Sequence, residues 1–375
     1  MTPFPEIKKK LGFGCMRLPM LDGEVDIEQT CRMVDAFLDA GFNYFDTAHG
    51  YIDGKSETAI RECLTSRHPR ESYLLTDKLS SGHFKTESDI RPLFQSKLDA
   101  CGVDYFDFYL MHAQGKVNYD HYLECRAYET AFALKAEGKV RHVGISFHDK
   151  AEFLERILND YPQIEVVQLQ LNYVDWDDMS VQGRQCYEVC RKHGKPVLVM
   201  EPVKGGNLVK LPDDAQQVYD ALNAARGTAN SNASYAIRFA AGLEGVVSVL
   251  SGMSDMAQME DNIRTMRDFT PLTQAEQDAV TRVAGILTGK PLIPCTACRY
   301  CTEVCPIGIP IPEFFACMNA RKVFNDWNQK FYYQDVLTVD SPKASDCLKC
   351  GACEDACPQH LEIRSLLENV AAEFE

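Results

Sequence analysis

Two short stretches near the carboxyl end of the chain repeat one spacing of cysteines. Each has the pattern C-x2-C-x2-C-x3-C-P, and the cysteines in order are Cys295, Cys298, Cys301, Cys305, Cys347, Cys350, Cys353 and Cys357. Thiolates bind iron, and loops of two residues let three sulfurs converge on three corners of one cube. The spacing therefore predicts two [4Fe–4S] clusters.

The last cysteine of each run is expected to bind the other cluster, because the x3 spacing and the proline carry it further away. This exchange is typical of bacterial two-cluster ferredoxins. The ligands predicted for the first cluster are Cys295, Cys298, Cys301 and Cys357. Those predicted for the second are Cys347, Cys350, Cys353 and Cys305. Disulfides or two zinc sites are the alternatives, but zinc ribbons use paired C-x2-C elements rather than four-cysteine runs ending in proline.

Upstream of the cysteines, from about residue 12 to residue 285, short apolar runs alternate with longer amphipathic stretches. The predicted strands are 12–16, 44–47, 73–79, 106–111, 140–146, 166–172, 197–201 and 246–251. Helical patterns between them include 27–40, 56–64, 150–159 and 179–193. Eight strand-then-helix units indicate an α/β fold, a (β/α)8 TIM barrel. A doubly wound sheet is the alternative, but no G-x-G-x-x-G follows the first strand.

This alternation stops near residue 270, where a helix at 272–287 precedes the first cysteine run. We therefore predict a barrel domain at 1–287 and a second domain at 288–375. Helical patterns occur between the cysteine runs at 311–328 and in the tail at 361–374. The second domain is thus predicted to be a small, mainly α-helical ferredoxin-like iron–sulfur domain.

Polar residues follow three consecutive predicted strands, where barrels of this kind place their active sites. Asp46 and Tyr51 follow the second strand, Lys78 ends the third, and His112 ends the fourth. Taken singly, each has an ordinary structural explanation, such as an ion pair or a pocket lining. Four at matching strand ends favour catalysis.

This set of four resembles the signature of the aldo-keto reductase family, which is Asp-x-Ala-x-x-Tyr with a lysine on strand three and a histidine on strand four. The resemblance covers roughly residues 8–285. Flanking motifs of the same type are Gly144-Ile-Ser146, Gln168-x-x-x-Asn172, Pro202-x-x-Gly205-Gly206-x-Leu208 and Glu260-Asp-Asn262. The fusion resembles a subgroup of predicted bacterial and archaeal oxidoreductases that carry a C-terminal ferredoxin-like extension.

The chemistry of carbonyl reduction explains why these residue types are needed. Hydride addition generates an alkoxide, which must receive a proton as it forms. Lys78 is expected to stabilise the phenolate of Tyr51 and lower the tyrosine pKa. Asp46 would keep Lys78 charged and oriented, while His112 would donate a hydrogen bond to the substrate oxygen.

The resemblance also implies a nicotinamide dinucleotide, NAD(P)(H), extended across the mouth of the barrel. Residues expected at its carboxamide are Ser146, Gln168 and Asn172. Residues expected at its pyrophosphate and adenosine are Lys204, Gly205, Gly206, Leu208, Gly252 and Asn262.

Two departures from the family leave NAD and NADP both open. Members that use NADP present a basic residue soon after strand eight, whereas here the first is Arg264 and Asp255 would repel a phosphate. The aromatic residue that stacks on the nicotinamide is replaced by Met200 or Glu201, although methionine can also pack against a ring. A flavin is a further possibility, because a hydride carries two electrons and a cubane carries one.

We therefore expect an iron–sulfur oxidoreductase. Its barrel would reduce a small-molecule carbonyl or oxidise the alcohol, and its clusters would exchange electrons with a redox partner protein. One alternative is an electron-transfer or redox-sensing protein whose barrel binds a cofactor without carbonyl turnover. Others are a flavin-linked reductase, and clusters that serve only to stabilise the tail.

Composition limits partners and location. The 375 residues include 39 Lys and Arg against 54 Asp and Glu, a net charge of −15. This charge argues against nucleic acid or an anionic membrane as a partner. No apolar run is long enough to span a bilayer, and no N-terminal signal pattern occurs. The other eight of the 16 cysteines are scattered, as expected for reduced thiols of a cytoplasmic protein.

Overall fold

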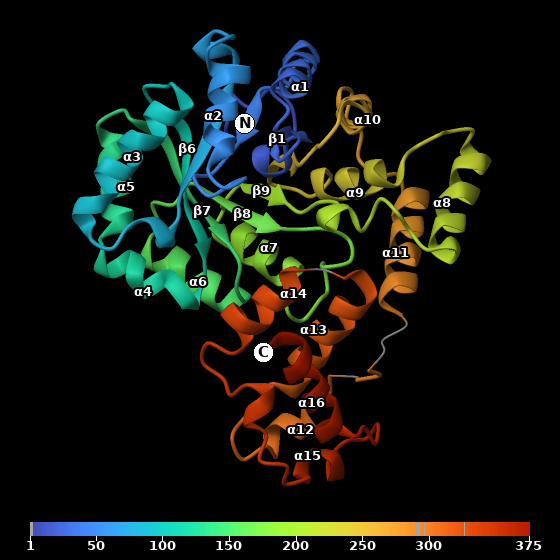
Figure 1. Ribbon diagram of the computed structural model, residues 1–375. Coiled ribbons are helices and arrows are strands. Elements are labelled where there is room, and N and C mark those ends of the chain that lie inside the picture. The colour runs from blue at the N-terminus through green and yellow to red at the C-terminus, as the bar shows by residue number, and fades with distance from the viewer. Residues whose placement is uncertain (1–2, 290–292, 296, 326) are drawn as a thin grey trace.

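The structure is a computed structural model that describes residues 3–289, 293–295, 297–325 and 327–375. Eight parallel strands close into a barrel in the order β1-β10-β9-β8-β7-β6-β5-β4 (Figure 1). Their bounds are β1 (Leu11–Gly14), β4 (Tyr44–Asp46), β5 (Leu74–Leu79), β6 (Phe106–Gln114), β7 (Val140–Phe147), β8 (Val166–Gln170), β9 (Val197–Met200) and β10 (Val246–Ser251). Each overlaps a predicted strand, with ends that differ by up to three residues, so the TIM-barrel prediction is confirmed.

Helices surround the barrel (Figure 1). They are α1 (Ile27–Asp39), α2 (Lys55–Ile60), α3 (Glu87–Cys101), α4 (Lys116–Glu124), α5 (Ala127–Ala136), α6 (Ala151–Asp160), α7 (Gly183–Lys192), α8 (Asp213–Arg226), α9 (Asn232–Ala241) and α10 (Met256–Met266). In α1, Asp26 caps the amino end by accepting from the Gln29 amide at 2.9 Å. Its apolar face buries Val34 and Phe37 against the barrel. A small antiparallel hairpin, β2 (Met20–Leu21) and β3 (Glu24–Val25), precedes this helix.

Alternation along the strands positions the polar residues. Large apolar side chains from six strands and the amino-terminal segment form one buried cluster, whose members are Phe4, Tyr44, Leu74, Phe108, Leu110, Val166, Leu198 and Leu250. Side chains two positions apart on a strand point to the same face. Asp46 therefore follows Tyr44 on the inner face of β4, and His112 follows Leu110 on β6. The polar residues therefore lie next to this apolar layer, toward the carboxyl ends of the strands.

The described residues of the second domain form helices joined by loops, and no strand. After α11 (Gln274–Thr288), its helices are α12 (Tyr300–Glu303), α13 (Ile311–Phe324), α14 (Asn328–Phe331), α15 (Ala352–Asp355) and α16 (Ile363–Phe374). The predicted helix 311–328 corresponds to α13 and the start of α14, and residue 326 lies outside the described residues. A separate apolar cluster that includes Phe314, Tyr333 and Val370 forms its core. The prediction of a small α-helical domain is confirmed.

This domain lies against the carboxyl ends of the barrel strands. The Tyr332 hydroxyl donates to Oε1 of Gln170 on β8 at 3.2 Å, and the Cys317 thiol donates to the Ser180 hydroxyl at 3.3 Å. Val181, from the loop after β8, belongs to the apolar core of the second domain. The two domains thus share both apolar and polar contacts. Of the helices described, none is long and apolar enough to cross a membrane.

The barrel wall requires a glycine at position 144 on β7. A Cβ there would lie 2.5 Å from the Val166 carbonyl oxygen and 2.8 Å from Cδ2 of Leu110. We predict that Gly144→Ala lowers the free energy of unfolding by about 1–3 kcal/mol, because added volume strains a packed core. Urea titration followed by circular dichroism measures this.

The control is Gly285→Ala in α11, where a Cβ meets nothing within 4 Å. There alanine should be neutral or stabilise the helix by up to about 1 kcal/mol. Equal stability of the two variants would contradict the close strand contact at Gly144.

Candidate active site and cysteine sites

Three of the four polar residues meet in a buried chain of contacts. The Lys78 ammonium donates to Asp46 Oδ1 at 2.5 Å, to the Tyr51 hydroxyl at 3.1 Å and to the Thr47 carbonyl oxygen at 2.9 Å. The Gln168 amide donates to the other Asp46 oxygen at 3.0 Å. Lys78 is completely buried, so its position and charge are set by these partners.

Burial and ion pairing shift the pKa values of these groups in opposite directions. Burial alone would lower the pKa of Lys78, but the charge of Asp46 and the hydrogen bonds to Asp46 and Tyr51 raise it overall. Burial raises the pKa of Tyr51 above 10.0, and the opposing effect of Lys78 is smaller. Lys78 thus lowers the pKa of Tyr51 in the expected direction, through its charge and its hydrogen bond, but burial outweighs this effect. Tyr51 is a protonated hydroxyl at neutral pH, in contact with a fixed ammonium.

His112 completes the set at the end of β6. Its Nδ1 lies 2.6 Å from the Ser80 hydroxyl, and its ring centre lies 5.9 Å from that of Tyr51. Burial, followed by the charge of Lys78, lowers the pKa of His112 well below 6.5. The ring is therefore neutral at pH 7. When Ser80 donates to Nδ1, Nε2 carries the hydrogen and can donate it to a substrate oxygen.

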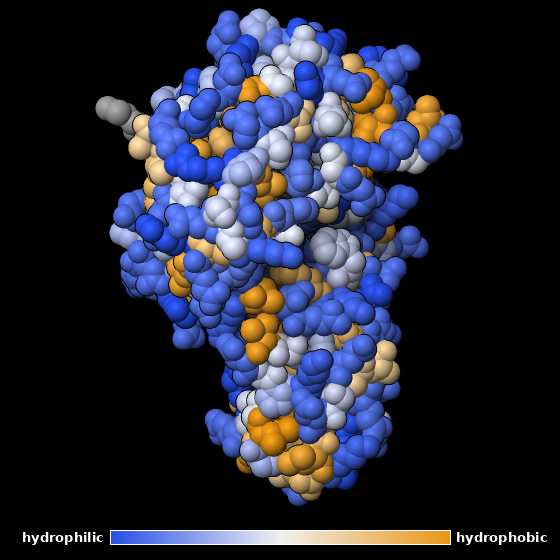
Figure 2. Space-filling model, turned by 60° about the vertical axis from the view of Figure 1, so that its left-hand side comes forward, coloured by the Kyte–Doolittle hydropathy of each residue, from blue (hydrophilic) through white to orange (hydrophobic). Residues whose placement is uncertain are grey.

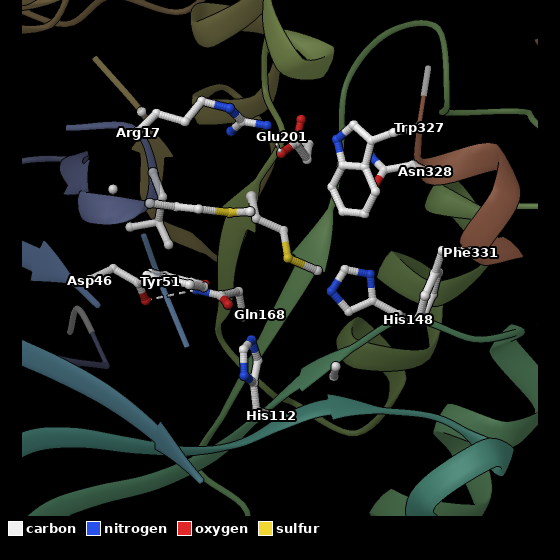
Figure 3. Close-up of a pocket in the computed structure, with 16 residues that line it drawn as sticks. Arg17, Asp46, Tyr51, His112, His148, Gln168, Glu201, Trp327, Asn328 and Phe331 are labelled. Carbon is white, nitrogen blue, oxygen red and sulfur yellow. Dashed lines mark hydrogen bonds and ion pairs between the residues drawn. The ribbon is translucent and has the colours of Figure 1, made fainter. Parts of the chain in front are cut away.

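A pocket of about 260 Å³ opens beside these residues, at the carboxyl ends of the strands. Tyr51, His112, Gln168 and Met200 line it, together with Leu250 of β10 and three residues that follow or end β1: Gly14, Met16 and Arg17. Figure 3 shows Asp46 and Tyr51 on one side and residues of the second domain on the other. Asp46, Tyr51 and His112 thus share one cavity, and Lys78 is buried in contact with the first two.

Lining residues that the sequence patterns did not indicate include Trp327, Asn328 and Phe331. They belong to the second domain, which the sequence assigns to iron alone. The sequence feature that could have indicated them is a dense run of aromatic residues at 327–333, next to a helical pattern. His148 also lines this pocket.

A longer groove of about 590 Å³ continues from the pocket. The two cavities share Arg17, Glu201, Leu250 and Gly252. Of the residues expected to bind a dinucleotide, those that line the groove are Gly205, Gly206, Gly252 and Asn262. Arg17 and Glu201 form an ion pair of 3.0 Å where the cavities meet.

Four other expected cofactor residues are buried beneath these cavities. Ser146 accepts a hydrogen bond from the Ala113 amide at 2.7 Å, and Leu208 is fully buried in an apolar cluster. Asn172 donates to Asp175 at 2.6 Å, and the Lys204 ammonium pairs with Asp175 at 2.7 Å. Lys204 is 1% exposed, so its charge is turned away from the groove and toward the protein interior.

The eight clustered cysteines gather in two separate cavities. Those lining the first are Cys295, Cys298, Cys301 and Cys357. Those lining the second are Cys305, Cys347, Cys350 and Cys353. Each cavity therefore contains three cysteines of one run and the last cysteine of the other, which is the exchange that the spacing predicts. All eight are free thiols in the structure, which therefore gives no support to the disulfide alternative.

The surroundings of these thiols suit a cluster. Ile311 borders both cavities, Phe315 the first and Leu367 the second, which gives an apolar shell. The amide of Ile309 donates to the Cys305 sulfur at 3.4 Å, a type of contact that tunes iron–sulfur clusters. Four thiols with an apolar shell and amide donors fit a [4Fe–4S] group. Among the described residues, no three His, Cys, Asp or Glu are arranged to hold a single metal ion.

Comparison with known families covers most of the chain. The model of the aldo/keto reductase family matches residues 10–284. The model of a 4Fe-4S dicluster domain matches residues 294–361.

Individual relatives are distant. The NADH-specific methylglyoxal reductase of Escherichia coli (strain K12) is 25% identical over 53% of this chain and 65% of its own length. Human aldo-keto reductase family 1 member C3 is 29% identical over 40% of this chain and half of its own length. This chain therefore spans less than two thirds of either relative. An aldo-keto reductase of Klebsiella pneumoniae, solved with NADPH, shares the fold at 21% identity and a TM-score of 0.59, covering 74% of this chain and 95% of that one.

The burial of the two pocket histidines predicts how they protonate as the pH falls. We expect the His112 ring to remain neutral as the pH falls through 6.5, because burial opposes its protonation. His148 should protonate only at a pKa of about 4 for the same reason. NMR titration of the ring nitrogens measures both, with the His112→Gln spectrum assigning the signals. A His112 signal that titrates near pH 6.5 would mean that water hydrates the ring.

Proposed function

This chain belongs to the aldo/keto reductase family, and we propose on this premise that its barrel reduces a small carbonyl compound, or oxidises the corresponding alcohol, with a nicotinamide dinucleotide. The observation that supports this most directly is the buried contact chain from Asp46 through Lys78 to Tyr51. It ends in a pocket that also contains His112 and opens into a long groove.

Each residue has a part in the proposed reaction. A bound nicotinamide would supply a hydride, with both of its electrons, to the carbonyl carbon. Tyr51 gives its proton to the carbonyl oxygen, which completes the alcohol. The Lys78 ammonium, held by Asp46, stabilises the phenolate that remains, and His112 donates a hydrogen bond to the oxygen as its charge grows.

The groove supports an extended dinucleotide, and we infer a preference for NADH from Asp255 and Asp261, which line it together with Arg17 and Lys210. Gly205 and Gly206 adopt positive φ angles of 63° and 99°, so the backbone turns at the groove without a side chain in the way. Asp255 and Asp261 line the far part of the groove, where a 2′-phosphate would meet their carboxylates. The guanidinium of Arg264 pairs with Asp261. One relative is named as NADH-specific, which agrees with this preference.

We further propose that the two cysteine sites each hold one [4Fe–4S] cluster and exchange single electrons with a redox partner protein. The sites lie near α12 and α15, at the end of the second domain away from the barrel (Figure 1). Cys298 and Cys350 are exposed, which brings a cluster edge to the surface. Figure 2 shows apolar surface at this end, and Val304 and Leu348, beside cysteines in the sequence, are 44% and 62% exposed.

The catalytic proposal predicts a large effect of one hydroxyl. In Tyr51→Phe, kcat/KM for NADH-dependent reduction of a small aldehyde should fall by about 10²–10⁴-fold, because the proton donor is lost. Absorbance at the nicotinamide band measures the rate, and NADH binding should persist. Tyr105→Phe is the matched control, because Tyr105 precedes β6 at the opposite end of the barrel. Unchanged turnover in Tyr51→Phe would overturn the proposed mechanism.

The cluster proposal predicts metal content. Protein purified without oxygen should contain about eight iron and eight sulfide per chain. Cys350→Ser should lose about half of both, because one cluster lacks a ligand. Cys31→Ser, a change at a half-buried barrel cysteine, should lose neither. Iron and sulfide assays decide, and a wild-type protein with only trace iron would rule the clusters out.

A further inference from the structure

One wall of the catalytic pocket comes from the iron–sulfur domain. Trp327, Asn328 and Phe331 line the same cavity as Tyr51 and His112. Figure 3 shows these three side chains together on one side of the cavity, with Asp46 and Tyr51 across from them. A barrel without the second domain would leave this side open to water.

Contacts on both sides of this wall hold it against the barrel. Before it in the sequence, Phe324 packs with its ring 5.2 Å from the ammonium of Lys204. After it, Tyr332 donates to Gln170. Within it, the Phe331 ring meets the His148 ring edge-on at 5.5 Å. The wall is therefore positioned by the same docking contacts that join the two domains.

The charges that face the pocket are matched in pairs. Asp46 is paired with the buried Lys78, which does not itself line the pocket, and Arg17 is paired with Glu201. Burial keeps the two histidines neutral by lowering their pKa values. Among the residues that line this cavity, each cation therefore already has a carboxylate. An anionic substrate would have to break one of these pairs to find a partner.

Apart from the amides of Gln168 and Asn328, the remaining lining is apolar or polarisable. Met16, Met200 and Leu250 line the same cavity as the aromatic wall. Arg17, Glu201, Leu250 and Gly252 are shared with the groove, so a dinucleotide would enter at that side. A substrate whose carbonyl reaches Tyr51 and His112 then extends toward Trp327 and Phe331. A volume of about 260 Å³ limits it to a small molecule.

We propose that Trp327 and Phe331 bind the substituent of the substrate, and that the substrate is an uncharged carbonyl compound bearing an aromatic ring. Aromatic rings attract one another in edge-on or offset arrangements, and thioethers add favourable contacts at ring edges. This inference rests on the proposed carbonyl reduction and adds the class of substrate and the residues that select it.

Selectivity measurements test this inference. With NADH in excess, kcat/KM is measured for benzaldehyde and for propanal. Trp327→Ala and Phe331→Ala should each lower the value for benzaldehyde roughly tenfold or more, with little change for propanal, because only the ring loses its contacts. Lys330→Ala, on the same short helix but outside the cavity, should change neither value. Equal loss for both aldehydes, or no loss for either, would overturn the inference.

Binding provides a second measurement that needs no turnover. The chain has two tryptophans, so in Trp176→Phe the fluorescence comes from Trp327 alone. Benzaldehyde should quench this signal to saturation, whereas propanal should not. If wild type reduces neither aldehyde, the proposed function fails, and the quenching result alone then decides whether the aromatic wall binds rings. Absence of saturable quenching would overturn the wall as a binding surface.

Discussion

Lys78 and Asp46 form an ion pair from which water is excluded. The active site depends on the hydrogen bonds by which the fold stabilises this pair. Removing two charges from water is unfavourable, so such a pair is retained only where further hydrogen bonds satisfy it. The Thr47 carbonyl and the Gln168 amide provide them. Losing either charged partner would leave the other buried alone, at a cost of about 3–5 kcal/mol. The barrel must therefore close before Tyr51 has a fixed ammonium beside it.

The inner face of the barrel places these polar groups through the alternation of inward-facing and outward-facing side chains along each strand. On β4, β6 and β8 an apolar side chain precedes a polar one by two positions: Tyr44 before Asp46, Leu110 before His112, and Val166 before Gln168. A slip of one residue in any strand would exchange the two faces and remove a member of the site. The parallel register, with Gly14 opposite Asp46 and Thr76 opposite Phe108, fixes how far each strand is displaced along its neighbour. The polar layer is thus a consequence of how the apolar layer packs.

This alternation is also why the barrel was predictable from sequence, while other features were not. Strands and cysteine spacings are local patterns, so all eight strands and the exchange of Cys305 and Cys357 follow from short stretches. The raised pKa of Tyr51 depends on burial by distant residues, which no motif records. Lys204 faces inward because Asp175, on another loop, is buried beneath it. Trp327 reaches the pocket only because two domains dock.

Docking also links the cysteine sites to the pocket through one helix. Ile311, at the amino end of α13, borders both cysteine cavities. Phe324, at its other end, packs on Lys204 shortly before the wall residue Trp327. Fourteen residues of helix span about 21 Å, so α13 is a rigid connection between the thiols and the aromatic wall. Small domains often need metal to fold. Iron bound at the far end would therefore order the wall without touching the substrate, which is a structural reason for this barrel to be joined to an iron–sulfur domain.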